Sequence, residues 1–452
     1  MATDFPIYDY KSNMVGGGAK LFKEINMPAL EEELIGLRRE FHRYPELGAL
    51  EFRTTARIVE ELERLGLSVR YGSVIHTKDK MFALPSPDDI ARHLVRAKEE
   101  GARPEILEKM RGGFTGCVAE INGAYPGPTI CIRVDIDCND LQETEDSCHI
   151  PVKKGFSSVH PECMHACGHD AHAAIGIGVA KLLCACRSQL HGKVVLIFQP
   201  DEEGLRGAAS LTHSGVLSGC DYFFGVHVGL KDMPVGTVAA SAHGFLAISK
   251  FDAVFQGQSA HAGVAPDQGK NALAAAATAM LNMLAIPRHH AGITRINVGT
   301  LHGGDGRNII PSRAVLGIET RGANTEINTY MEKTAKRICY TAAEMHECSC
   351  EIRFMGGADS AECDDALVRK TASILSKVEG VDRVIEDFDF GASEDVVTMM
   401  EQVQANGGQA TELIIGMPLV ASHHNDRFDI DERVIGIGAR CLAQLALVIG
   451  AP

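Results

Sequence analysis

Four short apolar runs in this 452-residue chain each end in acidic or histidine side chains. The runs are Thr129–Val134, Lys193–Gln199, Asp221–Val226 and Glu412–Met417. Continuous apolar runs of this length predict strands that are buried on both faces, as in parallel sheets. Helical patterns separate them, at Ala171–Leu190, Val396–Ala405 and Glu432–Ile449. This alternation of strands and helices predicts an α/β domain with a mostly parallel sheet.

A different order of elements occupies the middle of the chain. The pattern is a strand, a helix, two strands, a helix and a strand, at Ile248–Gln256, Asn271–Ala285, Thr294–Leu301, Ala314–Arg321, Asn324–His346 and Cys350–Met355. This βαββαβ order is ferredoxin-like. Because the α/β pattern resumes afterwards, we expect a second domain at residues 246–355, inserted between two parts of the first, 1–245 and 356–452. Residues 75–112 read as a further, polar and helix-prone insertion.

Composition narrows the class of protein. The net charge of −15 argues against nucleic acid or an anionic membrane as the main partner. We find no apolar stretch of roughly 18 residues and no apolar signal core in the first thirty residues, so we expect neither a membrane span nor a secretion signal. The fourteen cysteines have irregular spacings and form no CxxC pairs. That pattern favours a reducing cytoplasm over a disulfide framework or a zinc ribbon.

The side chains that follow the four runs are of the metal-binding type. Asp135 and Asp137 follow the first run, and Glu202 and Glu203 follow the second. His227 follows the third run, and the adjacent His423 and His424 follow the fourth. Open α/β sheets bind ligands at the carboxyl ends of their parallel strands. We therefore expect these four segments to meet at one edge of the sheet.

A fifth segment, Met164–His172, carries a cysteine and three histidines just before a helix. A helix N-terminus lowers the pKa of a thiol, so we expect Cys167 to be a thiolate ligand for a borderline metal, together with His169. Taken alone, each feature has an ordinary structural explanation, such as a small buried thiol or a solvated acidic turn. Their joint occurrence at five segment ends predicts a metal site.

The residue types also indicate a reaction. Of two adjacent carboxylates, one can bind metal while the other acts as a general base, and a metal ion acidifies water. That combination can hydrolyse an amide. The chain contains neither a GxSxG elbow nor a Walker-type loop, which disfavours serine hydrolysis and phosphoryl transfer.

Eight stretches together resemble one known family. They are Leu37–Thr55, Arg133–Asp137, Met164–His172, Gln199–Ala208, Gly225–Val228, Gly257–Gly263, Gly306–Pro311 and His424–Glu432. In this order they resemble the two-metal aminoacylase/carboxypeptidase metallopeptidases, in the amidohydrolase branch that includes auxin-conjugate and hippurate hydrolases. The resemblance implies a catalytic domain of the zinc-peptidase type, an inserted domain for dimerisation or as a lid, and two divalent ions, Mn²⁺ or Zn²⁺.

The resemblance also assigns roles residue by residue. It implies five metal ligands, which are Cys167, His169, Glu203, His227 and His424. Glu202 falls on the general base, and Asp137 on an aspartate that orients ligands. His261 falls on a histidine that reaches the scissile carbonyl, often from the other subunit of a dimer. Asn308 and Arg321 fall where relatives bind the substrate's carbonyl oxygen or carboxylate. The spacing to Phe428 favours His424 over His423, and His165 and His172 receive no ligand role.

The function implied by the resemblance is hydrolysis of an N-acyl amino acid, as in p-aminobenzoyl-glutamate cleaved to p-aminobenzoate and glutamate. One alternative is another conjugate, such as indole-acetyl-aspartate or hippurate, because one methylene changes binding by only about 1–3 kcal/mol. Asn425-Asp426 and Lys270-Asn271 also depart from common family pairs, which leaves the acyl group open. A further alternative is a subunit that is inactive without a paralogous partner. The expected assembly is a homodimer, or a heteromer with such a B subunit.

Overall fold

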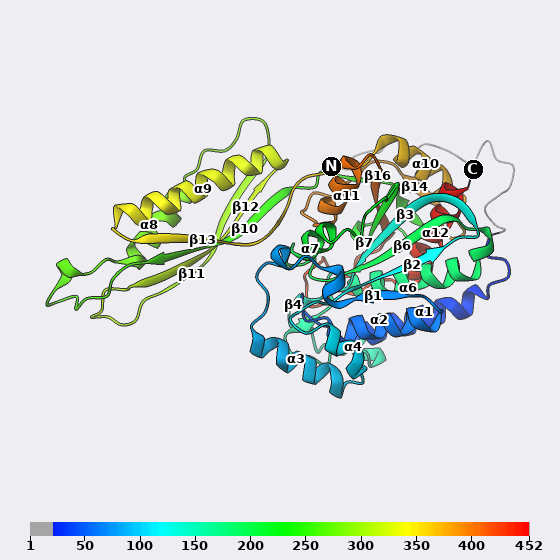
Figure 1. Cartoon of the computed structure of the whole chain (residues 1–452), viewed down its shortest axis with the longest axis horizontal. Coiled ribbons are helices and arrows are strands. Elements are labelled where there is room, and N and C mark those ends of the chain that lie inside the picture. The colour runs from blue at the N-terminus through cyan, green and yellow to red at the C-terminus, as the bar shows by residue number, and fades with distance from the viewer. Residues whose placement is uncertain (1–20, 452) are drawn as a thin grey trace.

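In the computed structural model, which describes residues 21–451, the larger domain is built on an eight-stranded sheet (Figure 1). Its strand order is β1-β2-β6-β3-β7-β16-β8-β14. These strands are β1 (Val69–Tyr71), β2 (Cys117–Asn122), β3 (Tyr125–Asp135), β6 (His191–Gln199), β7 (Tyr222–Asp232), β8 (Thr237–Ala239), β14 (Arg383–Ile385) and β16 (Gln409–Met417). The four apolar runs form its centre, where β6, β3, β7 and β16 are neighbours and pair in parallel. The predicted buried parallel strands are therefore confirmed.

Outside this parallel centre the sheet also contains antiparallel pairs, although the edge strand β14 pairs in parallel with β8. β2 pairs antiparallel with β1 and with β6, and β8 pairs antiparallel with β16. The parallel centre is covered on both sides, and alternate residues of β3 belong to two different cores: Ile132 faces one and Cys131 the other. Such double burial explains why the central strands are apolar throughout instead of alternating.

Helices cover both faces of this sheet. One face is covered by α1 (Met27–Arg43), α2 (Phe52–Arg64), α6 (His169–Ala185), α10 (Asp365–Leu375) and α12 (Arg433–Gly450). The other face is covered by α7 (Gly207–His213) and α11 (Val396–Ala405). The predicted helix Ala171–Leu190 begins two residues earlier and ends at Ala185, where a short turn at Arg187–Gln189 follows.

One expectation about apolar stretches is wrong. α12 is 18 residues long with a mean hydropathy of 1.5, which is long and apolar enough to cross a membrane. However, 89% of it is buried inside the fold, where it packs against α6 and α1. It is therefore accounted for as a core helix. The expected absence of a secretion signal concerns a stretch whose first twenty residues lie outside the described part of the chain.

The inserted domain is a second, separate sheet with two helices on one face. Its elements are β10 (Ala247–Gln256), α8 (Ala272–Leu284), β11 (Thr294–Gly303), β12 (Arg313–Gly322), α9 (Thr325–Met345) and β13 (Ser349–Ala358). The strand order β11-β12-β10-β13 is antiparallel throughout and encloses its own hydrophobic core. This confirms the βαββαβ prediction, and Figure 1 shows the unit projecting from one end of the larger domain. We keep 246–355 as its proposed extent, although β13 itself continues to Ala358.

The insertion at 75–112 carries α3 (Pro87–Glu99) and α4 (Pro104–Lys109), as its helix-prone sequence predicts. Ser86 caps α3 by accepting a hydrogen bond from the Asp89 amide, with Pro87 in the first turn. Short pieces complete the fold: the pair β4 (Asn139–Asp140) and β5 (Cys163–Met164), helix α5 (Ile150–Lys154), and the pair β9 (Ala242–His243) and β15 (Phe388–Asp389).

Candidate active site

The candidate site lies at the carboxyl edge of the parallel centre. Asp137 follows β3, Glu202 and Glu203 follow β6, His227 lies within β7, and His424 follows β16. Cys167 and His169 stand at the start of α6, where Gly168 takes a left-handed conformation (φ 89°). A Cβ on Gly168 would lie 2.6 Å from Val228 Cγ2, so this turn requires glycine both for its φ and for the close approach of β7.

Potential ligand atoms converge in overlapping sets, three of which contain at least two of the predicted ligands. Within each set all atoms lie within 4.8 Å of one another; these three sets are Cys167–Glu203–His424, His169–Glu202–Glu203 and Cys167–His227–His423. Cys167 Sγ lies 3.5 Å from His227 Nε2, and His424 Nε2 lies 3.3 Å from Glu203 Oε2. Cys167 and Glu203 each belong to two sets. The donor atoms are therefore spread over several overlapping groups and do not form one compact set.

Two buried polar atoms in this cluster have no hydrogen-bond partner within residues 21–451. They are His169 Nε2 and Glu203 Oε1, which face each other at 3.9 Å. An unpaired buried donor or acceptor is costly, and native structures rarely leave one without a reason. A soft thiol, imidazoles and carboxylates are the donors that zinc and related divalent ions prefer. The residues present therefore fit divalent metal ions.

Hydrogen bonds behind the cluster orient these ligand atoms. His169 donates from Nδ1 to the carbonyl oxygen of Asp137 at 3.1 Å, which leaves its Nε2 pointing into the site. His227 likewise donates from Nδ1 to the carbonyl of Val228 at 2.9 Å. Asp137 also accepts the Glu203 amide at 3.0 Å, so a single aspartate holds two of the predicted ligands. Fixing the far ring nitrogen is how proteins set the tautomer of a metal-binding histidine.

The two adjacent glutamates have opposite electrostatic environments. Burial, with the charges of Glu394 and Glu203 added, raises the pKa of Glu202 well above its usual range. Burial acts the same way on Glu203, but the hydrogen bond from His424 and the charge of His169 outweigh it and lower the pKa of Glu203 to about 2. Opposite pKa shifts in two adjacent carboxyl groups match the division of labour that the sequence predicts for a base and a ligand.

The predicted lowering of the Cys167 pKa is wrong. Burial of the thiol, and then the nearby charges of Glu203 and Glu202, raise the pKa of Cys167 well above its usual range. These local effects dominate the helix N-terminus, whose influence is modest and short-ranged. Without a cation beside it, Cys167 is therefore a thiol.

The remaining histidines near the cluster differ in their partners. Both ring nitrogens of His172 already have hydrogen-bond partners. Its Nδ1 pairs with Asp135 Oδ1 at 2.5 Å, and its Nε2 accepts the Val228 amide at 3.0 Å. Neither nitrogen of the buried His165 has a partner among the described residues. His423 bonds the carbonyl of Val228 at 3.2 Å, whereas His424 faces Glu203 and has a left-handed backbone (φ 58°). Such strain in a non-glycine residue is typical of functional sites.

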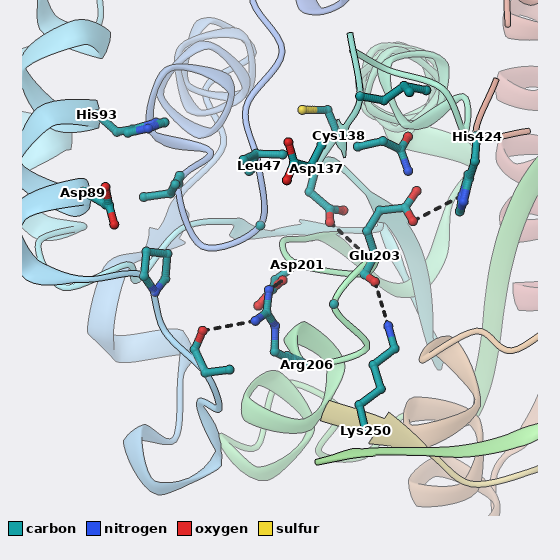
Figure 2. Close-up of a pocket in the computed structure, with 18 of the residues that line it drawn as sticks. Leu47, Asp89, His93, Asp137, Cys138, Asp201, Glu203, Arg206, Lys250 and His424 are labelled. Carbon is teal, nitrogen blue, oxygen red and sulfur yellow. Dashed lines mark hydrogen bonds and ion pairs between the residues drawn. The ribbon is translucent and has the colours of Figure 1, made fainter. Parts of the chain in front are cut away.

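Two hollows open onto the cluster. The inner one, of about 280 Å³, is lined by the predicted ligands Cys167, His227 and His424, with apolar walls from Leu230 and Phe390. The outer cleft, of about 850 Å³, extends from Glu203 to α3 of the 75–112 insertion, which contributes Asp89 and His93 (Figure 2). Arg321 lines both hollows, so the structure places this predicted substrate residue beside the cluster.

The structure does not bring His261 and Asn308 to the cluster of the same chain. Both are exposed, and they lie side by side, with the Ala262 amide donating to the Asn308 carbonyl at 2.9 Å. His261 follows the last residue of β10, and Asn308 precedes the first residue of β12. These two strand ends are paired with each other, at the end of the sheet that is far from the larger domain. Since a strand rises about 3.3 Å per residue, β10 carries the chain roughly 30 Å away from the larger domain before it reaches His261.

Sequence reasoning missed two residues of this site, Lys250 and Glu394, and gave no separate role to a third, Asp135. Lys250 and Glu394 line the inner hollow, and Asp135 lies 3.8 Å from His169 Nε2 while also pairing with the buried Arg133. Glu394 and Asp395 form an acidic pair before an apolar helix, but they follow no apolar run, so the rule that selected Glu202 and Glu203 did not select them. Lys250 gives no comparable signal, because a single lysine within a strand pattern is ordinary.

Comparison with known proteins agrees with this geometry. The model of "Peptidase family M20/M25/M40" matches residues 131–448. An Enterobacter agglomerans protein named indole-3-acetyl-aspartic acid hydrolase is 42% identical over 429 residues, covering 93% of this chain and 98% of its own. A p-aminobenzoyl-glutamate hydrolase subunit from Escherichia coli K12 is 43% identical over 420 residues, with coverages of 93% and 96%. A solved aminobenzoyl-glutamate utilization protein from Klebsiella pneumoniae superposes with a TM-score of 0.79 at 36% identity, covering 95% and 98% of the two chains.

Proposed function

Since the chain belongs to peptidase family M20/M25/M40 and is thus a metal-dependent amide hydrolase, we propose that it cleaves N-acyl amino acids of the p-aminobenzoyl-glutamate type. The products would be p-aminobenzoate and glutamate. The observation that carries the proposal is the convergence of thiol, imidazole and carboxylate ligands beside the buried Glu202. Two relatives of nearly equal identity act, by their names, on glutamate and aspartate conjugates, so indole-acetyl-aspartate is the second candidate substrate.

The residues that would hold two divalent ions, Mn²⁺ or Zn²⁺, are Cys167, His169, Glu203, His227 and His424. When bound, such ions polarise the scissile carbonyl and lower the pKa of a water molecule. Asp137 orients His169 and Glu203 through its carbonyl and carboxylate oxygens.

Glu202 carries the proton transfers in this proposal. As the carboxylate, which a nearby cation favours, it accepts the proton of the attacking water and then delivers it to the nitrogen of the leaving amino acid. Arg321 would bind a substrate carboxylate through its guanidinium group. His261 and Asn308 would donate to the carbonyl oxygen as it gains negative charge, a contribution worth about 3–4 kcal/mol per donor in comparable enzymes.

The direct test is a hydrolysis panel. Purified chain, stripped of metal and reloaded with Mn²⁺ or Zn²⁺, should release glutamate from p-aminobenzoyl-glutamate faster than it cleaves hippurate, as measured by amino-acid analysis. Faster release from indole-acetyl-aspartate would move the assignment to that conjugate. Two bound metals without turnover of any substrate would support the alternative in which a second, paralogous chain is required.

The remote position of His261 supports a homodimer in which each protomer completes its partner's site. We expect Glu202→Gln and His261→Ala homodimers to be nearly inactive on their own, and co-refolded mixtures to recover about a quarter of wild-type activity. That fraction follows because half of the mixed dimers are heterodimers and each has one intact site. If His261 acts within its own chain or not at all, mixing restores nothing beyond the sum of the parents. The control is a mixture of Glu202→Gln with His302→Ala, which changes an exposed histidine of β11. It measures the activity of a mixture in which the second variant leaves the proposed site intact.

A further inference from the structure

Lys250 stands at the site without an acidic partner. It lies half-buried on β10, and its Nζ donates to the carbonyl oxygen of Glu203 at 3.2 Å (Figure 2). In the part of the chain that the structure describes, no ion pair joins it to a carboxylate. A partly buried ammonium group with one carbonyl acceptor retains unused donors and an unneutralised charge.

The neighbouring cation, Arg321, is in a different state. In the β10–β12 ladder Lys250 lies opposite Glu319, and Ile248 lies opposite Arg321. Alternate residues of a strand share a face, so Lys250, Glu319 and Arg321 lie on the same face of the sheet. Arg321 donates from Nε to Glu319 at 2.7 Å, so a carboxylate already offsets part of its charge. Lys250 is the less compensated of the two cations.

Both cations stand where the two hollows meet. The residues shared by the linings of the inner hollow and the outer cleft are Glu203, Lys250, Arg321 and His424. Two of these four are proposed metal ligands and two are cations. A substrate whose amide lies at the ligands therefore places its amino-acid half within reach of both positive groups.

Building on the proposed function, we infer that Lys250 determines specificity by binding the side-chain carboxylate of the amino-acid half, while Arg321 binds the α-carboxylate. The site would then select N-acyl dicarboxylic amino acids over N-acyl neutral ones. An uncharged side chain would leave the ammonium group without its counterion, which is the usual physical basis of strong discrimination by a polar pocket.

The test compares p-aminobenzoyl-glutamate with p-aminobenzoyl-glutamine, which differ only in the side-chain carboxylate. For Lys250→Met, we expect kcat/KM for the glutamate substrate to fall about 10- to 100-fold, and that for the glutamine analogue to fall by less than about threefold. Lys250→Arg should restore part of the preference. Lys333→Met, at an exposed lysine of α9, is the matched control and should leave the preference as in the wild type.

Equal losses on both substrates would overturn the inference, because Lys250 would then only support the Glu203 loop. If the wild type cleaves neither substrate, the proposed function fails, and a binding measurement still decides the inference. Glutarate titrated calorimetrically into metal-loaded chain should bind the wild type at least about tenfold more tightly than Lys250→Met. Equal affinities there would reject the carboxylate site.

Discussion

Replacing Glu202 by glutamine should lower kcat by about 10²- to 10⁴-fold while leaving metal content and thermal stability unchanged. The reason is that glutamine keeps the size and polarity of the side chain but cannot accept and return a proton. Burial raises the pKa of Glu202 and so disfavours its charged form in the metal-free protein. Replacing it by a neutral glutamine should therefore have little effect on stability. Steady-state kinetics on the best substrate of the panel, with metal analysis of the same samples, measures both effects.

Glu401→Gln is the matched control for this substitution. Glu401 lies half-buried on α11, and burial raises its pKa to about 7, yet it lies outside the linings of both hollows. It should retain wild-type kcat. A Glu202→Gln variant with more than about a tenth of wild-type kcat would assign the proton transfers to another group.

Metal should stabilise the chain, and increasingly so as the pH rises from 6 to 9. In the metal-free protein, burial opposes the charge on His169, but Asp135 and Asp137 outweigh it and raise its pKa to about 10. A raised pKa contributes stability that is complete below the unfolded value, about 6.5, and is lost as the pH rises towards 10. A metal ion takes the place of this proton and of the Cys167 proton, so its affinity grows with pH.

The magnitude follows from mass action. At a thousandfold excess over Kd, each ion that binds only the folded state adds about 4 kcal/mol. Thermal melts with and without Mn²⁺ or Zn²⁺ across this pH range measure the effect, provided that unfolding is reversible. A metal-induced rise in Tm that is independent of pH would contradict the assignment of His169 and Cys167 as ligands.

The adjacent histidines provide a matched pair for the same experiment. His424→Ala should bind fewer metal ions and show a smaller rise in Tm, because His424 faces Glu203. His423→Ala should keep the full metal content, because His423 is bonded to the Val228 carbonyl. The reverse pattern would exchange their roles.

Local sequence patterns predicted most of the elements that position the site. β10 to β13 and the two helices between them occur within a few residues of their predicted bounds, because each alternates or repeats in the manner of its own element. The approach of Glu203, His227 and His424 was also predictable, since parallel strands bring their carboxyl ends to one edge. The antiparallel pairing of β2 and β8 was not, because single-strand patterns carry no information on direction.

The properties of the site that could not be predicted from the sequence depend on which residues surround a side chain in the folded protein. The pKa of Cys167 is set by burial and by two glutamates 35 and 36 positions later in the chain, which exceed the local helix effect on which the expectation relied. Lys250 enters the site only through the register of β10 with β12 and the position of the inserted domain. The position of His261 was also not predictable. The resemblance assigns it a role at the scissile carbonyl, but it does not reveal that β10 carries this residue away from the cluster of its own chain.

The spread of the ligands along the chain has a consequence for biosynthesis. Cys167 and His424 are separated by more than half of the sequence, and β7 acquires its neighbour β16 only after the whole inserted domain has been made. Long-range pairing of this kind delays folding relative to local contacts. A nascent chain on the ribosome therefore holds Cys167 and Glu203 without His424 until the last segments emerge. Completion of the predicted ligand set thus becomes a late event in the life of each molecule, confined to chains whose last segments have been synthesised and folded.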